Sequence, residues 1–179
     1  MRVALGLALV LLGCGGAESP EDLGSEGSGV EREIRGFTMT ETHDGSLLWE
    51  LEAEYAWRIP QEHKVHLEEL EMVFYDNQGI EASRLTARRG SVDEETGILT
   101  TEHRVKLISV AGDTLTTEEL TYDKENDLVS GPGFVRLAKP DRVLTGFDFQ
   151  STPDLSDYEV REDVTITIVD DGENIKSAP

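Results

Sequence analysis

The feature that most limits the fold is a strict two-residue alternation of apolar and acidic side chains in residues 49–57. Three glutamates, at positions 50, 52 and 54, separate the apolar residues. Successive side chains of a strand point to opposite faces, whereas a helix would spread the same residues around its whole circumference. The segment therefore predicts a half-buried β-strand whose apolar face consists of Trp49, Leu51, Ala53, Tyr55 and Trp57.

The same alternation recurs in residues 65–67, 70–74, 105–107, 134–137, 144–149 and 164–168. Turn sequences rich in Gly, Asp, Asn and Pro separate these segments, at residues 44–45, 76–79, 96–97, 112–113 and 139–141. No segment carries a convincing helical stripe of apolar residues. The sequence therefore predicts an all-β chain of many strands.

A weak internal repeat relates residues 85–99 to residues 115–129, at an offset of about 30 residues. Each copy reads as strand, polar turn and strand, and a single copy cannot bury its own apolar face. Stacked copies predict a continuous, folded-over sheet with one long interior.

The N-terminus carries an export signal. Residues 3–12 form an unbroken apolar run after Arg2, and residues 11–14 read Leu-Leu-Gly-Cys. The run is shorter than the roughly 20 residues that cross a bilayer, and it fits the apolar region of a secretory signal. The Leu-Leu-Gly-Cys string resembles the lipobox of bacterial lipoproteins, which implies cleavage before Cys14 and acylation of its thiol. The alternative is an ordinary secretory signal with a chance cysteine.

The predicted organisation has four parts. Residues 1–13 are the signal peptide, and residues 14–34, rich in Gly, Ser and Glu, form a flexible acidic linker. Residues 35–169 form the folded β-domain, and residues 170–179 form a disordered tail.

Charge and cysteine content exclude several classes of protein. The 37 acidic residues outnumber the 16 basic ones and give a net charge of -21. Such a surface repels nucleic acid, and no run of Lys or Arg offsets the repulsion. Because Cys14 is the only cysteine, no intramolecular disulfide can form, and the apolar core must hold the domain together.

Candidate catalytic and metal sites are weak. His63 and His66 are three residues apart in a predicted strand, so they point to opposite faces and are unsuited to sharing a metal. Residues 123–127 alternate acids like the start of a calcium loop, but the required glycine and final glutamate are missing. No phosphate loop, dinucleotide fingerprint or nucleophile elbow is present. The sequence predicts a protein without catalytic residues, metal or cofactor.

Three blocks of sequence, in this order and spacing, resemble the LptC family of lipopolysaccharide export proteins and the related LptA-like fold. They are residues 44–56 with 73–76, residues 115–123 with 128–131, and residues 143–147. The resemblance spans roughly residues 36–164. It implies an open antiparallel β-jellyroll, a V-shaped pair of sheets whose apolar interior holds acyl chains. The residues expected to line this interior are Trp49, Leu51, Tyr55, Trp57, Val65, Leu67, Met72 and Phe74.

The resemblance also implies partners and a location. The expected role is to receive lipopolysaccharide from the membrane subunits of an ABC transporter, LptF/LptG-like, and to pass it to an LptA-like periplasmic jellyroll. The expected location is the periplasm, lipid-anchored to the inner membrane. The anchor is predicted by the lipobox and departs from the family pattern, since many members have an N-terminal transmembrane helix. Gly15 rather than Asp follows Cys14, so the inner-membrane retention signal is absent and an outer-membrane anchor stays open. An alternative function is that of a structural or adaptor lipoprotein with a closed β core and only protein partners.

Partner jellyrolls are expected to join at exposed sheet edges by β-augmentation. The resemblance places the transporter near residues 36–42 and the next jellyroll at residues 144–169. Gly146 interrupts the latter strand pattern, which indicates a bulge or close backbone approach at this predicted partner interface, or a tolerated bend.

The lipobox generates the first testable prediction. Cys14→Ser should yield an uncleaved or soluble precursor without acyl mass, because serine cannot take the thioether-linked lipid. Metabolic labelling with a fatty acid and membrane fractionation check this. A variant that labels and sediments with membranes as before contradicts the lipobox.

Overall fold

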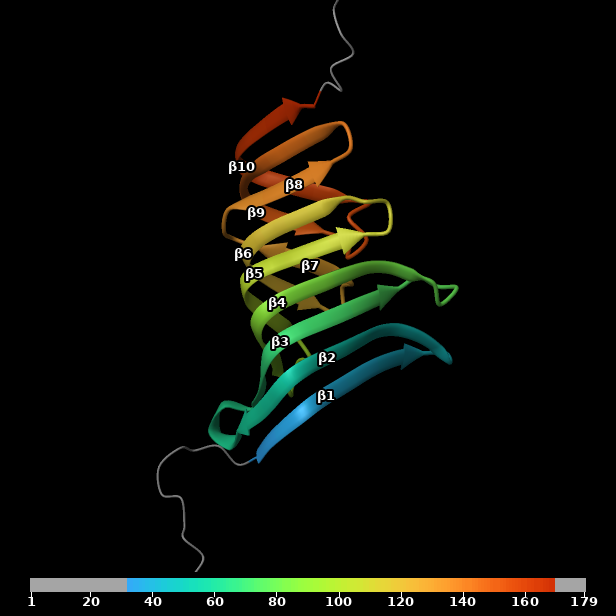
Figure 1. Ribbon diagram of the computed structural model, residues 1–179, viewed down its shortest axis with the longest axis vertical. Helices are drawn as coiled ribbons and strands as arrows, with labels where there is room; N and C mark the ends of the chain where they lie inside the picture. The colour runs from blue at the N-terminus through green and yellow to red at the C-terminus, as the bar shows by residue number, and fades with distance from the viewer. Residues whose placement is uncertain (1–31, 170–179) are drawn as a thin grey trace, which may run out of the picture.

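The computed structural model describes residues 32–169, which form ten strands of one antiparallel sheet (Figure 1). The strands are β1 (Arg32–His43), β2 (Ser46–Ile59), β3 (Lys64–Tyr75), β4 (Glu81–Asp93), β5 (Leu99–Ser109), β6 (Thr114–Asp123), β7 (Leu128–Gly131), β8 (Val135–Lys139), β9 (Arg142–Ser151) and β10 (Tyr158–Ile168). A 3-10 turn, η1 (Pro60–Glu62), joins β2 to β3, and no α-helix occurs within residues 32–169. The all-β jellyroll prediction is confirmed.

Strands that are consecutive in the sequence are mostly neighbours in the sheet (Figure 1). β1 to β6 are sequential neighbours, and β7 and β8 share a single position between β6 and β9. β10 pairs with β9 only, so β1 and β10 are free edges at opposite ends of the stack. β1 begins at Arg32, so residues 32–34 belong to the sheet rather than to the predicted linker.

The strands bend near their middles, and the bends line up across the sheet. Gly36 in β1, Glu69 in β3 and Asp148 in β9 have φ angles of 65°, 48° and 53°. The register of the pairs places Gly36 beside Glu54 of β2, and Glu54 beside Glu69. Between β1, β2 and β3 the register is the same on both sides of the bend, whereas the β4–β5, β5–β6 and β9–β10 pairs shift register there, and such bulges bend a strand and increase its twist. The bends therefore form one transverse line, here called the crease, along which the sheet folds over.

The crease changes which side chains point inward. Within each half of a strand, buried positions are two residues apart, but across the crease they are three apart, as from Ala53 to Ala56 in β2 and from Leu67 to Leu70 in β3. The shift keeps an apolar face inward on both sides of the fold.

The two halves of the folded sheet form two walls. Wall 1 contains residues 33–35, 55–68, 89–102, 119–131 and 149–162, and wall 2 contains residues 37–53, 70–87, 105–117, 135–146 and 164–168.

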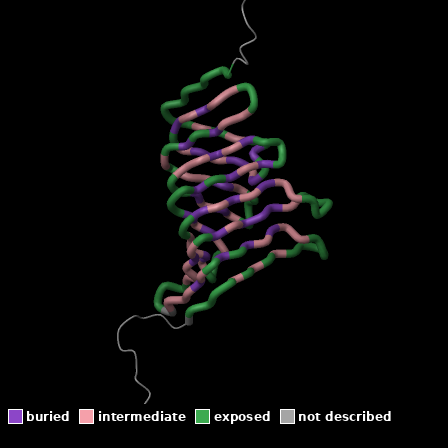
Figure 2. Tube along the Cα trace, viewed as in Figure 1, coloured by how far each residue is buried: buried purple, intermediate pink, exposed green. Residues whose placement is uncertain are grey.

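The core lies between the walls, where buried residues concentrate along the middle of the stack (Figure 2). The largest fully buried side chains come from most of the strands: Leu51, Leu67, Met72, Leu85, Val105, Leu107, Leu115, Leu120, Val129, Leu137 and Phe149. Each buried leucine contributes about 1.5–3 kcal/mol to folding. The exposed positions gather at the hairpin tips and on the end strands β1 and β10 (Figure 2).

Close backbone approach at the crease requires glycine at Gly131. A Cβ at this position would lie 2.7 Å from the carbonyl oxygen of Glu119 on β6, a distance that Cβ atoms do not adopt. At Gly133, two residues later in the junction between β7 and β8, the nearest atom to such a Cβ is Thr117 Oγ1 at 4.0 Å.

These two glycines form a matched pair for a stability test. Gly131→Ala should lower the free energy of unfolding by about 1–3 kcal/mol, because overpacking forces the backbone apart. Gly133→Ala should leave it unchanged or raise it by up to about 1 kcal/mol, because alanine restricts the unfolded chain. Urea denaturation followed by far-UV circular dichroism measures both. Equal effects of the two substitutions would contradict the packing of the crease.

Candidate lipid-binding groove

An apolar ladder runs along the inner face of wall 2 from one edge of the sheet to the other. Each member pairs directly with the next on the neighbouring strand. In order, the ladder consists of Met39, Leu51, Met72, Leu85, Leu107, Leu115, Leu137, Leu144 and Ile166. Its middle members are fully buried against wall 1, whereas Met39 is only partly covered and Ile166 is 55% exposed. The interior is therefore packed in its middle and uncovered at its ends.

The β1 end of the interior is hollow. A cavity of about 550 Å³ opens there between the walls, and its apolar lining consists of Phe37, Met39, Trp49, Val65 and Val92. Phe37 and Met39 belong to the edge strand β1, which has a neighbour on one side only. The rim is charged, with Glu41, Asp93, Glu94 and Lys124. We call this cavity the β1-end hollow.

One ion pair joins the walls beside the β1-end hollow. Lys124, in the turn between β6 and β7, lies with its Nζ 3.5 Å from Oε2 of Glu41 on β1. Both side chains are about one-third exposed, so solvent screens the pair and its contribution to stability is at most about 1 kcal/mol. The ion pair connects the two walls, but separating the walls at this point costs little free energy.

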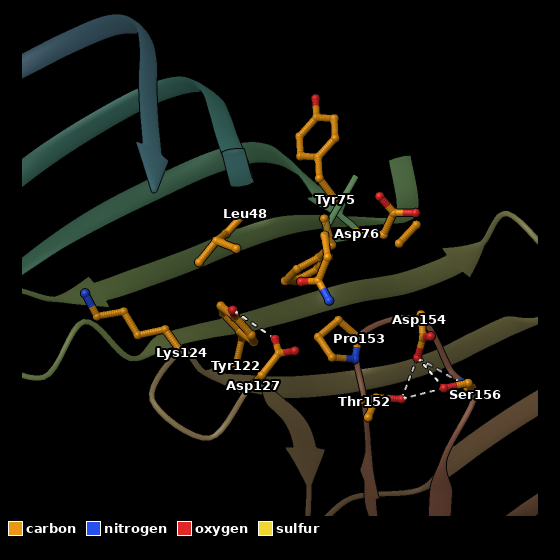
Figure 3. A pocket seen from close by; sticks show the side chains of 13 residues that line it. Leu48, Tyr75, Asp76, Tyr122, Lys124, Asp127, Thr152, Pro153, Asp154 and Ser156 are labelled. Atoms are coloured by element: carbon orange, nitrogen blue, oxygen red, sulfur yellow. Dashed lines mark hydrogen bonds between the residues drawn. The ribbon is translucent and has the colours of Figure 1, made fainter. Parts of the chain in front are cut away.

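A second opening, the slot, lies between the free margins of the two walls (Figure 3). It has a volume of about 380 Å³, and its lining includes Leu48, Phe74, Tyr75 and Asp76 from wall 2 and Tyr122, Lys124, Asp127 and residues 152–154 from the opposite margin.

Aromatic contacts close the floor of the slot. The rings of Phe74 and Tyr122 meet edge to face with centroids 4.9 Å apart, and the Tyr122 hydroxyl lies 3.3 Å from Oδ1 of Asp127. Burial, followed by the charge of Asp127, raises the pKa of Tyr122 above its ordinary value. The hydroxyl therefore stays protonated and donates to Asp127.

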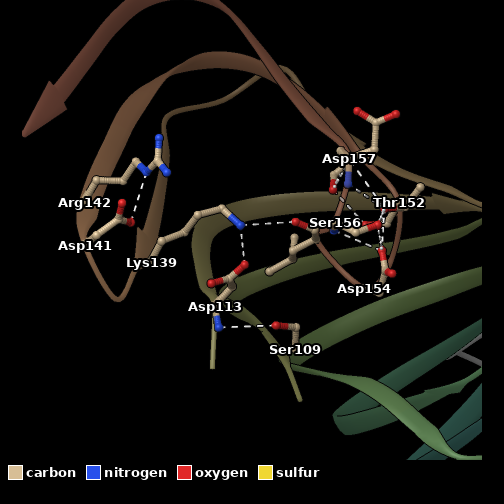
Figure 4. A network of polar contacts seen from close by, with 11 residues as sticks. Ser109, Asp113, Lys139, Asp141, Arg142, Thr152, Asp154, Ser156 and Asp157 are labelled. Atoms are coloured by element: carbon tan, nitrogen blue, oxygen red, sulfur yellow. Dashed lines mark hydrogen bonds and ion pairs between the residues drawn. The ribbon is translucent and has the colours of Figure 1, made fainter. Parts of the chain in front are cut away.

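A polar network joins the free margins of the two walls beside the slot (Figure 4). Lys139 and Asp113, at the margin of wall 2, form an ion pair in which both side chains are largely buried. Lys139 also donates from Nζ to the carbonyl oxygen of Leu155 at 3.4 Å and lies 4.8 Å from the ring centroid of Tyr158. These contacts fasten the connection between β9 and β10 to the margin of wall 2.

Six of the eight predicted lining residues lie on the inner face. They are Trp49, Leu51, Val65, Leu67, Met72 and Phe74. The prediction that residues 49–57 present one continuous apolar face is wrong, because the crease at Glu54 shifts the inward position to Ala56. Tyr55 and Trp57 therefore point outward. Arg35 lies 5.3 Å from the Tyr55 ring centroid, and Trp57 stacks on His66 at 5.4 Å.

Gly146 lies one strand inside the edge rather than on it. It pairs with Val135 of β8, and it is covered on the other side by β10, where the ladder shifts register. A Cβ there would lie 2.6 Å from the carbonyl oxygen of Glu162. The glycine thus marks a close backbone approach beside a bulge. A role in partner contact remains a prediction, and it would act through the shape of β10.

Sequence reasoning missed several residues of the interior. Phe37 and Met39 carry the same two-residue alternation as the later strands, and this signal could have identified them. Tyr122 and Val92 lie within the detected repeat. Leu155 gives no signal, since it is an isolated leucine among turn residues.

Comparison with known proteins identifies the family. A family model described as lipopolysaccharide-assembly, LptC-related, matches residues 3–169. The chain belongs to the LptC family. A search of curated proteins finds no match.

LptC-family membership assigns the protein to lipopolysaccharide transport in the bacterial envelope, as a periplasmic transport component. Cys14, the predicted lipidation site, lies outside the described residues. The part of the chain that the structure describes contains no helix long and apolar enough to cross a bilayer. Residues 32–169 also contain no cluster of three or more His, Cys, Asp or Glu side chains arranged to hold a metal ion.

The ion pair between Lys139 and Asp113 generates a prediction on stability. Lys139→Met should lower the free energy of unfolding by about 3–5 kcal/mol, because it leaves the Asp113 carboxylate buried without its partner. The double substitution Asp113→Asn and Lys139→Met should recover most of the loss, since no charge is then buried. Thermal and urea unfolding of the three proteins measures this. A double variant no more stable than Lys139→Met contradicts the unpaired-charge explanation.

Proposed function

We propose that this LptC-family protein binds the acyl chains of lipopolysaccharide between its two walls and passes the lipid along the sheet. It receives lipopolysaccharide from the LptF/LptG-like membrane subunits of the ABC transporter and delivers it to an LptA-like jellyroll. The observation that supports this proposal is the apolar ladder, which runs without interruption from Met39 on one edge strand to Ile166 on the other. A protein with a self-contained core has no need of an apolar track that ends uncovered at both edges.

The β1-end hollow is the proposed receiving site. Its volume of about 550 Å³ and its lining of Phe37, Met39, Trp49, Val65 and Val92 suit hydrocarbon, which gains roughly 0.8 kcal/mol for each methylene removed from water. The saccharide and phosphate groups would remain in water beyond the charged rim. No bond is made or broken, so the protein acts as a conduit and takes its driving force from the transporter.

The free edges are the proposed joints. β1 and β10 both expose unpaired backbone groups along one side, and each can accept a further strand. We place the transporter's jellyroll on β1 and the next periplasmic jellyroll on β10. Lipidation of Cys14, with residues 15–31 as a tether, would hold the domain near the membrane surface.

The packed middle of the interior favours a second candidate function. Leu67, Leu107 and Leu115 are 0% exposed, as expected of a closed core in an adaptor with protein partners alone. The two candidates differ in one measurable property, which is binding of lipid by the purified protein.

Neighbouring residues of β1 provide a matched test. Met39→Glu places a charge in the β1-end hollow, whereas Thr40→Glu places the same charge on the exposed outer face of the same strand. Met39→Glu should weaken binding of a fluorescent lipid A analogue at least tenfold, because an unpaired charge resists burial against acyl chains. Thr40→Glu should bind within about twofold of the unmodified protein, because its added charge lies outside the hollow. The two variants carry equal net charge, so a difference between them reports the position of the charge.

Fluorescence titration of the full-length proteins measures these affinities, with circular dichroism as the check on folding. Equal binding by Met39→Glu and Thr40→Glu would contradict the receiving site. Absence of binding by the unmodified protein would favour the adaptor.

A further inference from the structure

The connection between β9 and β10, residues 152–157, contains a fully buried leucine among polar residues. Its sequence is Thr-Pro-Asp-Leu-Ser-Asp, and Leu155 is 0% exposed. The side chain belongs to the core cluster formed by the two walls. A connection of this kind normally lies over the surface, with its side chains in water. Here it inserts one hydrocarbon side chain into the interior beside the slot.

Leu155 is held in a left-handed backbone conformation, with φ at 60°. This conformation is unfavourable for a residue with a bulky side chain, and it persists only where the surrounding contacts enforce it. The enforcing contacts are polar and local. Leu155 N donates to the carbonyl oxygen of Thr152 at 3.0 Å, and Asp154 Oδ1 accepts from the hydroxyls of Thr152 and Ser156 at 2.5 and 2.8 Å.

The turn lies outside the pairing of the sheet. β9 ends at Ser151 and β10 begins at Tyr158, so residues 152–157 contribute no strand pairing. Thr152, Pro153, Asp154 and Ser156 line the slot, which is open beside them (Figure 3). From the margin of wall 2, Lys139 donates one long hydrogen bond of 3.4 Å to the Leu155 carbonyl oxygen (Figure 4).

We propose that the Leu155 side chain occupies a hydrocarbon-chain site and that an acyl chain displaces it when lipid enters the interior beside the slot. This inference rests on the proposed function and extends it by locating a second acyl site, distinct from the β1-end hollow. The leucine closes the apolar interior of the empty protein, and an acyl chain of the same apolar character replaces it. Displacement also frees the backbone of residue 155 from its left-handed conformation. Loss of leucine burial is thereby offset by burial of the acyl chain.

A matched pair of variants tests the site with cis-parinaric acid, a fatty acid that fluoresces in apolar surroundings. In the full-length protein, Leu155→Gly removes the competing side chain and tolerates the positive φ. It should bind the probe at least fivefold more tightly than the unmodified protein. Leu120→Ala creates a comparable space at a buried leucine of β6 in wall 1, outside the apolar ladder and the linings of the slot and the β1-end hollow, and should give no such gain. Equal or weaker binding by folded Leu155→Gly overturns the inference.

Hydrogen exchange of the unmodified protein provides a second measurement that does not depend on any variant. At saturating probe, the amide of Leu155 should exchange at least tenfold faster than in the free protein, because its bond to Thr152 is released. A merely structural turn would exchange at the same rate or more slowly when ligand binds, and that result overturns the inference.

The outcomes separate this site from the proposed function. If Leu155→Gly binds the fatty acid and the unmodified protein does not bind the lipid A analogue, the site stands and the conduit fails. If neither protein binds either lipid, both fail. If the unmodified protein binds the lipid A analogue while the Leu155 amide keeps its slow exchange with bound fatty acid, the conduit stands and the Leu155 site fails.

Discussion

The crease is the constraint on which the rest of the structure depends. β3 and β2 contain twelve and fourteen residues. If strands of this length were straight, they would bury one face along their whole length and would need a second sheet to cover it. The three-residue step at the crease lets the same sheet supply its own cover, because each strand contributes to both walls. The interior, its two ends and the slot between the free margins all follow from this folding. So does the requirement for glycine where backbones come together, as at Gly131 and Gly146.

The interior is uneven along its length, and this unevenness reconciles a stable fold with a binding function. A small β protein without a disulfide needs a packed core, and the middle strands provide one. Binding of hydrocarbon needs uncovered apolar surface, and the edge strands provide it. The polar contacts that join the margins of the walls, Glu41 with Lys124 and Lys139 with Leu155, are exposed or long. The walls are thus held firmly by apolar packing and only weakly by these polar contacts.

Local sequence predicted much of the fold. Two-residue periodicity identified the strands, and the Gly, Asp and Pro clusters identified the hairpin tips, because both signals act over a few residues. The periodicity failed at Tyr55 and Trp57, since the alternation of residue types continues through Glu54 although the backbone there does not remain regular. The residues beside Glu54 on the neighbouring strands, Gly36 and Glu69, have positive φ angles, and this alignment across strands carries no local signal in β2. The burial of Leu155 was likewise inaccessible, because it depends on packing against residues distant in sequence.

The position of the crease on the two edge strands limits what can add to this sheet. β1 carries its bend at Gly36, and β10 carries a register shift between Glu162 and Thr165. A straight incoming strand can follow either edge along one wall only, and it loses contact where the edge turns. A strand bent at the matching place can follow both walls and continue the apolar track. The geometry of the edge thus discriminates by shape: it disfavours the flat, indefinitely repeating association typical of exposed β edges and favours chains that are themselves folded over.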